Sequence, residues 1–394
     1  MSWRTELGEL ADAIGSQVKR GADALERLVD RDPYQVVGYR GYGTGSRLLV
    51  LGRVLEHEGL AVPDPGHSKL RNLLAMLKRI ESDPLPFARI RARLPEGVRE
   101  LVADDEGFIR TWLDCSIAEE GWGAMKLELS QPPQGAAAEG LFTFLIPPSS
   151  AVYGVISDLD DTVLQSGVTD FIRAARTVLL ENAQTRLPFP GVAGFYRALV
   201  AGPTGAAVNP IFYVSSSPWN LYDVIAEFLE VQQIPQGPML LRDWDIGPSL
   251  LRNASHKLES IKEILATYPS LPFILVGDSA QEDPEIYADI VATYPGRILA
   301  VYIRNIRPHP ERLRGISLLA GQVQAAGSTL VLADDTLTAA RHAAVHGWIE
   351  ADALTQVGEE KQADEAGKEP APGVEQQSAP TLVVDKDVGV AELD

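Results

Sequence analysis

Two aspartates stand two positions apart after a short apolar run, in the order Val155-Ile-Ser-Asp158-Leu-Asp160-Asp-Thr162. If this run is a strand that ends at Asp158, both carboxylates project from its carboxyl end, where open parallel sheets place their chemistry. A carboxylate can attack phosphorus and form an aspartyl-phosphate, which divides one difficult displacement into two. A second carboxyl can protonate the leaving alkoxide and then activate water. The spacing alone is equally typical of an Asp-rich turn in an acidic protein.

Further polar groups follow other apolar runs in the same half of the chain. The run at 211–214 is followed by Ser215, whose hydroxyl can donate a hydrogen bond to a phosphoryl oxygen. Lys257 opens a helical segment and could neutralise phosphate, although a solvated surface lysine, with Lys262 as a competitor, is the alternative. The run at 273–277 ends in Asp278, and Asp283 follows it. Carboxylate oxygens from two strand ends suit Mg²⁺, which would offset the repulsion between an anionic nucleophile and an anionic substrate.

This order of Asp, Ser, Lys and Gly-Asp…Asp resembles the signature of the haloacid dehalogenase superfamily. More narrowly, residues 152–349 resemble the catalytic domain of the actin-patch-protein type phosphatidate phosphatases. Five blocks carry this resemblance: Ser157-Asp-Leu-Asp-Asp-Thr-Val163 with Gly167-Val-Thr169, Tyr213-Val-Ser-Ser-Ser-Pro-Trp-Asn-Leu-Tyr222, Gly237-Pro-Met-Leu-Leu-Arg-Asp-Trp244, His256-Lys-Leu-Glu259 and Gly277-Asp-Ser-Ala-Gln-Glu-Asp-Pro-Glu-Ile-Tyr287.

The resemblance implies Mg²⁺-dependent hydrolysis of phosphatidate to diacylglycerol and phosphate through an aspartyl-phosphate. It implies these roles: Asp158 as nucleophile and metal ligand, Asp160 as acid/base with its backbone carbonyl on the metal, Asp278 as metal ligand, Asp283 as its support, Thr162 as a loop residue, and Ser215 and Lys257 as phosphoryl-binding groups. The residues alone lead to a magnesium-dependent phosphatase or phosphotransferase. Another phosphomonoester, soluble or macromolecular, therefore stays open as the substrate, and a non-catalytic scaffold stays open as the function.

The elements that must position these groups follow from the alternation of short apolar runs and helical segments after residue 148. The apolar runs are at 153–157, 210–214, 273–276, 298–303 and 329–332, and the helical segments are near 191–200, 221–230, 257–267, 284–292 and 310–325. This alternation predicts an α/β catalytic domain over 148–350, with a parallel, Rossmann-like sheet of the haloacid dehalogenase kind and helices on both faces. The segments 164–190 and 234–255 are too short for a substantial cap, which favours an open crevice and a phosphate presented on a large object.

The sequence before residue 148 predicts a different type of structure. Residues 1–31 are expected to form one amphipathic helix, docked on its own protein rather than on a membrane because its acidic residues outnumber its basic ones. Residues 32–147 predict a small antiparallel β-sandwich. Within it we expect strands at 47–55, 88–93, 108–113 and 125–129, a turn at 104–107, a helix at 68–80 and a loop over the glycine-rich residues 38–45.

The composition limits the partners. The 394 residues contain 35 Lys and Arg against 54 Asp and Glu, a formal net charge of −19 that excludes nonspecific nucleic-acid binding and opposes unaided membrane adhesion. A single cysteine, Cys115, excludes an internal disulfide framework and a Cys-based zinc site. Residues 351–394 are acidic and aperiodic, which predicts a disordered tail. With no spanning run and no secretory start, we expect a cytoplasmic protein with peripheral membrane contact.

Some residues are candidates for the substrate side of the crevice. Trp219 and Trp244 follow two of the blocks, where an indole could lie at a lipid headgroup interface, and Arg242 is their neighbour. An arginine cluster follows or flanks the run at 298–303: Arg297, Arg304, Arg307, Arg312 and Arg314. We expect Arg304 and Arg307 to contact lipid, and the alternative is a solvated helix start with ordinary ion pairs.

Overall fold

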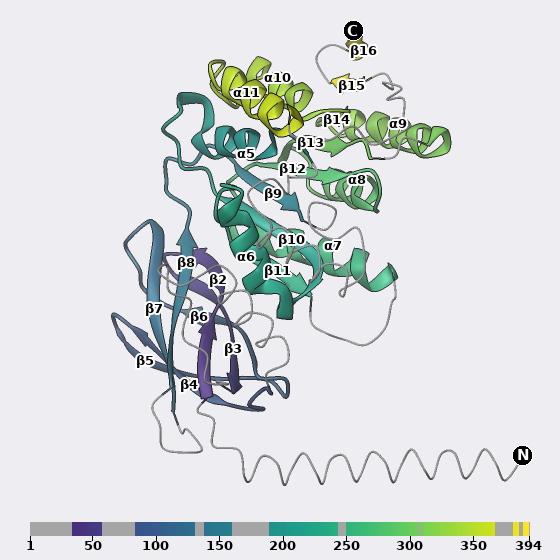
Figure 1. Ribbon diagram of the computed structural model, residues 1–394. Coiled ribbons are helices and arrows are strands. Elements are labelled where there is room, and N and C mark those ends of the chain that lie inside the picture. Colours follow the sequence, from purple (N-terminus) through teal and green to yellow (C-terminus); the bar gives the residue numbers. More distant parts are fainter. Residues whose placement is uncertain are drawn as a thin grey trace, which may run out of the picture.

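The computed structural model describes residues 34–56, 83–130, 138–159, 189–242, 250–306, 309–366, 381–385 and 389–393, and these form two packed bodies (Figure 1). A mainly antiparallel front sheet lies beside a layered α/β body that holds the predicted chemistry. The helices expected at 1–31 and 68–80 lie outside the described residues, as does most of 164–190. None of the described helices has both the length and the apolar character that crossing a bilayer requires.

The front sheet contains the expected strands. Its described strands are β1 (Tyr34–Gly38), β2 (Arg40–Thr44), β3 (Arg47–Glu56), β4 (Arg89–Leu94), β5 (Gly97–Val102), β6 (Phe108–Asp114), β7 (Gly121–Leu129) and β8 (Glu139–Ile146). They form one hydrogen-bonded sheet in the order β1-β3-β2-β8-β7-β4-β5, with β6 also paired to β3. All pairs are antiparallel except β2 with β8. The expected antiparallel sandwich is therefore one continuous sheet that contains one parallel pair. This pair, β2 with β8, joins strands from the beginning and the end of the domain sequence.

The glycine-rich residues 38–45 were expected to form a loop, and this prediction is wrong. They contain β2, which pairs with both β3 and β8. A Cβ at Gly41 would lie 2.2 Å from Leu49 O, and one at Gly43 would lie 2.1 Å from Arg47 O. Glycine is needed at both positions because the neighbouring backbone approaches too closely to leave room for a side chain.

The α/β body contains a second sheet in the order β11-β10-β9-β12-β13-β14-β15-β16. Its parallel strands are β9 (Gly154–Asp158), β10 (Ile211–Pro218), β11 (Met239–Arg242), β12 (Phe273–Asp278), β13 (Ile298–Arg304) and β14 (Thr329–Ala333), and β15 (Thr381–Asp385) and β16 (Gly389–Leu393) are antiparallel. The five expected parallel strands are confirmed. β11 was missed because it has only four residues.

Helices cover both faces of this sheet. The described helices are α5 (Val192–Ala201), α6 (Tyr222–Val231), α7 (Leu250–Thr267), α8 (Asp283–Thr293), α9 (Pro310–Ala325), α10 (Thr336–Val345) and α11 (Ala353–Ala366). α5, α10 and α11 contact one another on one face, whereas α7, α8 and α9 lie on the other (Figure 1). The five expected helices are confirmed, with α7 beginning earlier than predicted, and the general α/β fold is as expected.

The prediction of a disordered tail is wrong for α11 and for the two strands that follow it. Val357 is fully buried, Arg197 of α5 forms an ion pair with Glu360, and Asp364 accepts a hydrogen bond from Gly191 N at 2.8 Å. β15 pairs with β14 and extends the sheet. The acidic residues of α11 thus have partners on other elements, and composition alone does not reveal such partners.

The two bodies share one hydrophobic core. Tyr39, Tyr42 and Phe108 of the front sheet belong to the same buried cluster as the α/β body. Glu263 of α7 accepts hydrogen bonds from Trp112 Nε1 at 3.1 Å and from Arg110 at 2.5 Å, and a longer one from Tyr42 Oη at 3.4 Å. The front sheet therefore contacts α7, the same helix that carries the predicted Lys257.

Candidate active site

Three predicted side chains lie at or near the carboxyl ends of neighbouring strands. Asp158 ends β9, Asp278 ends β12, and Ser215 follows Val214, which is the register partner of Asp158 in β10. All three residues are buried. Because carboxyl ends of parallel strands meet at one edge of the sheet, the apolar runs bring together groups that are far apart in sequence.

Lys257 points from α7 into this cluster. Its Nζ lies 2.8 Å from Asp158 Oδ1 and 3.1 Å from Asp283 Oδ1, and it donates to Gln281 Oε1 at 3.2 Å. Only 3% of Lys257 is exposed, so the alternative of a solvated surface lysine is wrong. Lys262, the competitor, instead forms an ion pair with the exposed Glu259 at 3.1 Å.

Asp283 supports the site from the start of α8. Its Oδ2 accepts the backbone N–H of Asp278 at 3.1 Å, while Asp278 Oδ1 accepts N–H groups of Ala280 at 2.7 Å and Gln281 at 3.2 Å. A Cβ at Gly277 would lie 2.5 Å from Asp283 Oδ2. The glycine before Asp278 is thus required for the two carboxylates to pack closely.

The carboxylates of Asp158, Asp278 and Asp283 form a compact group in which one oxygen of each lies within 4.8 Å of the others. All three residues are buried, and Lys257 supplies one ammonium among them. Buried charges are stable only when they are compensated, and carboxylate oxygens are the ligands that Mg²⁺ prefers. The donor set and its charge therefore fit a divalent cation.

Ser215 lies in a distorted stretch of β10. The register with β11 shifts between Val214 and Pro218, and Ser215 Oγ accepts the backbone N–H of Ser217 at 3.0 Å. Neither the short helix at Trp219–Leu221 nor α6 has a side-chain cap. Ser216 and Ser217 therefore do not cap these helices, and this stretch continues the strand to Pro218.

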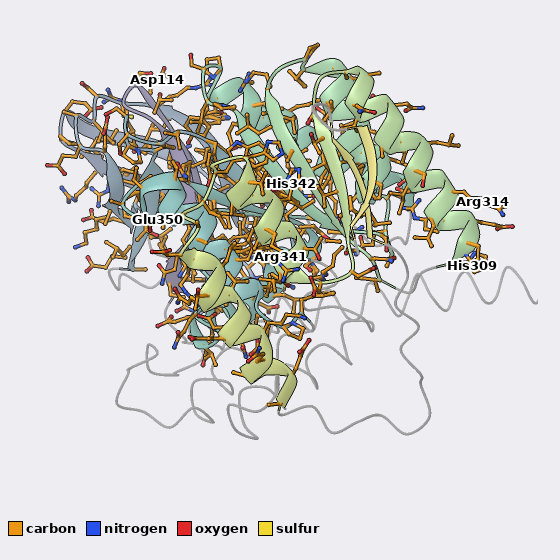
Figure 2. All side chains as sticks on the ribbon, turned by 90° about the horizontal axis from the view of Figure 1, so that it is seen from above. Asp114, His309, Arg314, Arg341, His342 and Glu350 are labelled. Atoms are coloured by element: carbon orange, nitrogen blue, oxygen red, sulfur yellow. The ribbon has the colours of Figure 1, made fainter. Side chains whose placement is uncertain are left out.

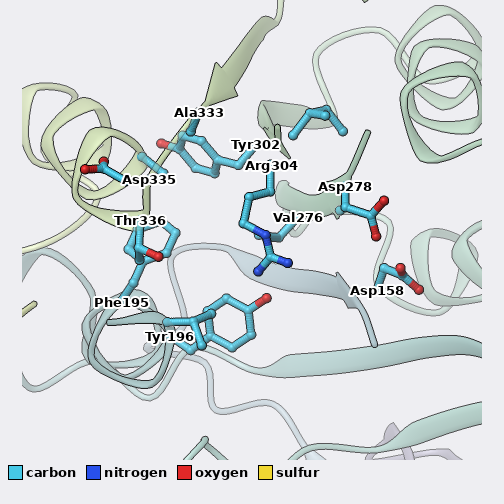
Figure 3. Close-up of a pocket in the computed structure, with 14 residues that line it drawn as sticks. Asp158, Phe195, Tyr196, Val276, Asp278, Tyr302, Arg304, Ala333, Asp335 and Thr336 are labelled. Carbon is cyan, nitrogen blue, oxygen red and sulfur yellow. The ribbon is translucent and has the colours of Figure 1, made fainter. Parts of the chain in front are cut away.

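A pocket opens beside these carboxylates on the α5 and α10 side of the sheet (Figure 3). Its apolar walls come from both helices and three strands: Val192, Phe195, Val276, Tyr302, Ile303, Ala333 and Ala339. Tyr196 also lines it, and its hydroxyl lies 2.7 Å from Ser157 Oγ. Burial raises the pKa of Tyr196, so this hydroxyl stays protonated. Sequence reasoning missed Tyr196, because a tyrosine within a predicted helix gives no signal that its hydroxyl reaches a strand end.

The prediction that Trp219 lies at a lipid interface is wrong. Only 5% of the residue is exposed, and its ring stacks on Tyr39 of the front sheet with 5.1 Å between centroids. The ring of Tyr222 also stacks on Trp219, with 6.1 Å between centroids. The indole packs between the two bodies because the front sheet covers this part of the strand edge. Arg242 is half-buried at the end of β11, where it is the register partner of Pro218.

The predicted arginine cluster does not form one surface patch among the described residues. Arg297 lies before β13, at the opposite edge of the sheet, where it donates to the carbonyls of Leu265, Tyr268 and Leu271. Arg312 pairs with Glu285, and Arg314 is exposed on α9 (Figure 2). Arg304 extends into the pocket beside Asp158 (Figure 3). The alternative of ordinary ion pairs describes Arg312. Of the remaining predicted residues, Asp160, Thr162, Trp244 and Arg307 lie outside the described residues.

Comparison with known proteins places this site within a family segment. A family model described as "Phosphatidate phosphatase APP1, catalytic domain" matches residues 153–305. Phosphatidate phosphatase APP1 of Saccharomyces cerevisiae is 34% identical over 155 residues, which is 38% of this chain and 25% of that protein. An uncharacterised protein of Schizosaccharomyces pombe is 30% identical over 160 residues, or 39% of this chain and 25% of that protein.

The chain thus aligns with about a quarter of the length of these curated relatives. Among solved structures, a carbohydrate acetylesterase from Xanthomonas citri reaches a TM-score of 0.24 at 13% identity, over 72% of each chain, which is too low to carry an argument. The family segment contains Asp158, Ser215, Lys257, Asp278 and Asp283, so it coincides with the strands and helices that build the candidate site. Residues 153–305 are therefore similar to the catalytic domain of phosphatidate phosphatase APP1.

Proposed function

We propose that this chain is a Mg²⁺-dependent phosphatase of the haloacid dehalogenase type that hydrolyses phosphatidate to diacylglycerol and phosphate, acting from the cytoplasm on a membrane surface. The observation that carries the proposal is the contact of Lys257 with Asp158 and Asp283, beside Asp278, inside the family segment. The similarity to phosphatidate phosphatase APP1 supports the substrate.

In the proposed first step, a carboxylate oxygen of Asp158 attacks phosphorus and the ester P–O bond breaks, which leaves an aspartyl-phosphate and an alkoxide. Asp160 protonates the alkoxide, so diacylglycerol leaves as the alcohol. In the second step water attacks the aspartyl-phosphate, Asp160 accepts the proton of that water, and Asp158 leaves as the carboxylate. The role of Asp160 rests on its place in the sequence block.

Lys257 stabilises the charge and the orientation of the Asp158 nucleophile. An ammonium 2.8 Å from Asp158 Oδ1 favours the ionised carboxylate and restricts its rotation. Its second contact, to Asp283, holds the lysine in place through α8. Ser215 lies on the neighbouring strand β10, one residue beyond the register partner of Asp158, where its hydroxyl can reach a phosphoryl oxygen.

Mg²⁺ would be held by Asp158 and Asp278, with the backbone carbonyl of Asp160 as a further ligand. When bound, the ion offsets the charge of the phosphate and of the attacking carboxylate. Asp283 is placed to support rather than to coordinate, because Lys257 and Asp278 N–H already contact its two oxygens. Asp278 is oriented by the N–H groups of Ala280 and Gln281.

Phosphate release tests the proposal most directly. The purified full chain should release phosphate from phosphatidate in mixed vesicles when Mg²⁺ is present, and EDTA should abolish this release until Mg²⁺ is restored. A panel of sugar phosphates, nucleotides and phosphopeptides defines the specificity. Phosphate release from one of these compounds but not from phosphatidate would mean that the enzyme uses the same chemistry on another substrate. No release from any monoester by folded, Mg²⁺-supplied protein would favour a scaffold.

A further inference from the structure

Arg304 faces the pocket because of its place in β13. Two residues earlier, Tyr302 packs edge-on against Phe195 of α5 at 5.7 Å and its hydroxyl lies 3.0 Å from His342 Nδ1 of α10. Side chains two apart in a strand project from the same face, so Arg304 projects toward α5 and α10 as well. Figure 3 shows it extending toward the Tyr196 ring, with the carboxylates of Asp158 and Asp278 at one side of the same pocket.

Arg304 and Lys257 approach Asp158 from opposite faces of the sheet. Lys257 comes from α7 on the opposite face of the sheet and already contacts Asp158 and Asp283. Of the described residues that line the pocket, Arg304 alone is cationic. A phosphomonoester dianion that approaches Asp158 adds two negative charges to a group of three carboxylates. A second cation on the pocket side would reduce the resulting repulsion.

The guanidinium of Arg304 is held against a ring. Its carbon lies over the ring of Phe189, which is half-buried next to the core. Such stacking uses the face of the guanidinium, whereas phosphate is bound by N–H groups at its edge, so the two contacts are compatible. Apolar walls around it lower the local polarity and strengthen a charge-assisted hydrogen bond.

We propose that Arg304 binds the phosphate group of the substrate inside this pocket, as the partner of Lys257 on the other side of Asp158. This inference rests on the proposed phosphomonoester hydrolysis and deepens it. It replaces the expected role of Arg304 as a lipid contact, and the two roles predict different experimental results. A membrane contact matters only for substrates in vesicles, whereas a phosphate-binding residue matters for every phosphomonoester.

The test compares Arg304→Gln with Arg314→Gln, which removes the same charge from an exposed site on α9 outside the pocket. Each variant is assayed with phosphatidate in vesicles and with soluble p-nitrophenyl phosphate. For Arg304→Gln we expect KM to rise at least about tenfold on both substrates, and the inhibition constant of inorganic phosphate to rise by a similar factor. Arg314→Gln should leave all of these within about twofold.

Loss on vesicles alone, with soluble turnover and phosphate inhibition unchanged, would overturn the inference. If wild-type protein hydrolyses no monoester, the proposed function fails, and calorimetric binding of inorganic phosphate to wild type and Arg304→Gln then decides the inference by itself. Equal binding, or no binding to wild type, would contradict it. If Arg304→Gln does not fold, Arg304→Lys keeps the charge without the planar fork. We expect it to weaken phosphate binding at least about threefold, and unchanged binding would again overturn the role.

Discussion

Lys257 Nζ lies 2.8 Å from Asp158 Oδ1, and 4% and 3% of the two side chains are exposed. The pair is therefore largely shielded from water, and its two side chains are close enough for opposite charges to compensate each other. Because α7 also contacts the front sheet through Glu263, the position of this lysine depends on packing well outside the strand edge. The consequences for activity and for stability can be measured separately.

Asp158→Asn should abolish phosphate release, with a loss of at least about a thousandfold, because an amide cannot serve as the attacking carboxylate. The measurement is phosphate release under Mg²⁺ saturation, together with a thermal unfolding curve to show that the variant is folded. Asp289→Asn is the matched control, because Asp289 is exposed on α8. Activity that survives Asp158→Asn would refute the assignment of the nucleophile.

Lys257→Met should lower the free energy of unfolding by about 3–5 kcal/mol in Mg²⁺-free buffer, because it leaves buried carboxylates without their ammonium partner. Urea unfolding at pH 7 measures this change. Lys262→Met removes a lysine of the same helix whose ion-pair partner Glu259 is largely exposed, and should change stability by less than about 1 kcal/mol. Equal effects of the two substitutions would show that the buried contacts of Lys257 contribute little.

Glu263→Ala should destabilise the protein by about 2 kcal/mol, because it removes the acceptor of the Trp112 indole N–H and of Arg110 between the two bodies. Glu259→Ala, one turn earlier on α7 and exposed, should stay within about 0.5 kcal/mol of wild type. Chemical denaturation followed by tryptophan fluorescence distinguishes them. A silent Glu263→Ala variant would mean that these hydrogen bonds are replaced by water without cost.

Trp219→Ala should act on stability rather than on membrane affinity. Truncating a buried aromatic residue costs about 3–5 kcal/mol, and Trp219 packs against both Tyr39 and Tyr222. Trp122→Ala, at a tryptophan that is 45% exposed on β7, should cost much less. Unfolding and vesicle co-sedimentation are measured side by side. Weaker vesicle binding by a Trp219→Ala protein of unchanged stability would restore the lipid-interface role.

Asp335→Ala should show a pH-dependent loss of stability. Burial alone would raise the pKa of Asp335, but hydrogen bonds from Lys361 and Thr338 outweigh it and hold the pKa below the ordinary value of 3.8. The folded state therefore binds fewer protons, so Asp335 stabilises the protein above pH 3.8, and this stabilisation is lost as pH falls through the lower folded pKa. Asp335 is the N-cap of α10, where its Oδ1 accepts the backbone N–H of Thr338 at 2.8 Å. We expect Asp335→Ala to cost about 1 kcal/mol at pH 7, because this cap is lost. In unfolding curves at decreasing pH, the difference from wild type should shrink; a constant difference would contradict this origin.

The strands of the candidate site could be predicted because Asp158, Ser215 and Asp278 each end or follow an apolar run. Asp283 opens α8, whereas Lys257 lies within α7, which begins at Leu250 rather than at the lysine. Parallel pairing then brings the ends together without further information. The contacts of Lys257 could not be predicted, since an exposed and a buried lysine have the same local sequence pattern. Only the direction in which α7 packs decides between them.

Long-range packing explains the wrong predictions as well. Gly41 and Gly43 suggested a loop, but they are needed because the backbone of β3 passes close to them. This strand contact cannot be seen in the local sequence. Trp219 suggested an exposed indole because the front sheet that covers it is remote in sequence. α11 has no apolar stripe beyond the buried Val357, and its partners Arg197 and Gly191 lie more than 150 residues earlier, so no local pattern predicts it.

The shared core has a consequence for how residues 153–305 can be isolated. The sequence similarity begins at residue 153, but Tyr42 of the front sheet packs edge-on against Phe212 at 5.3 Å, and Tyr268 Oη donates to Gly43 O at 3.0 Å. A polypeptide trimmed to the similarity boundary would present these aromatic side chains to water and would be prone to aggregate. The segment of sequence similarity is therefore shorter than the unit that we expect to fold, which includes the front sheet.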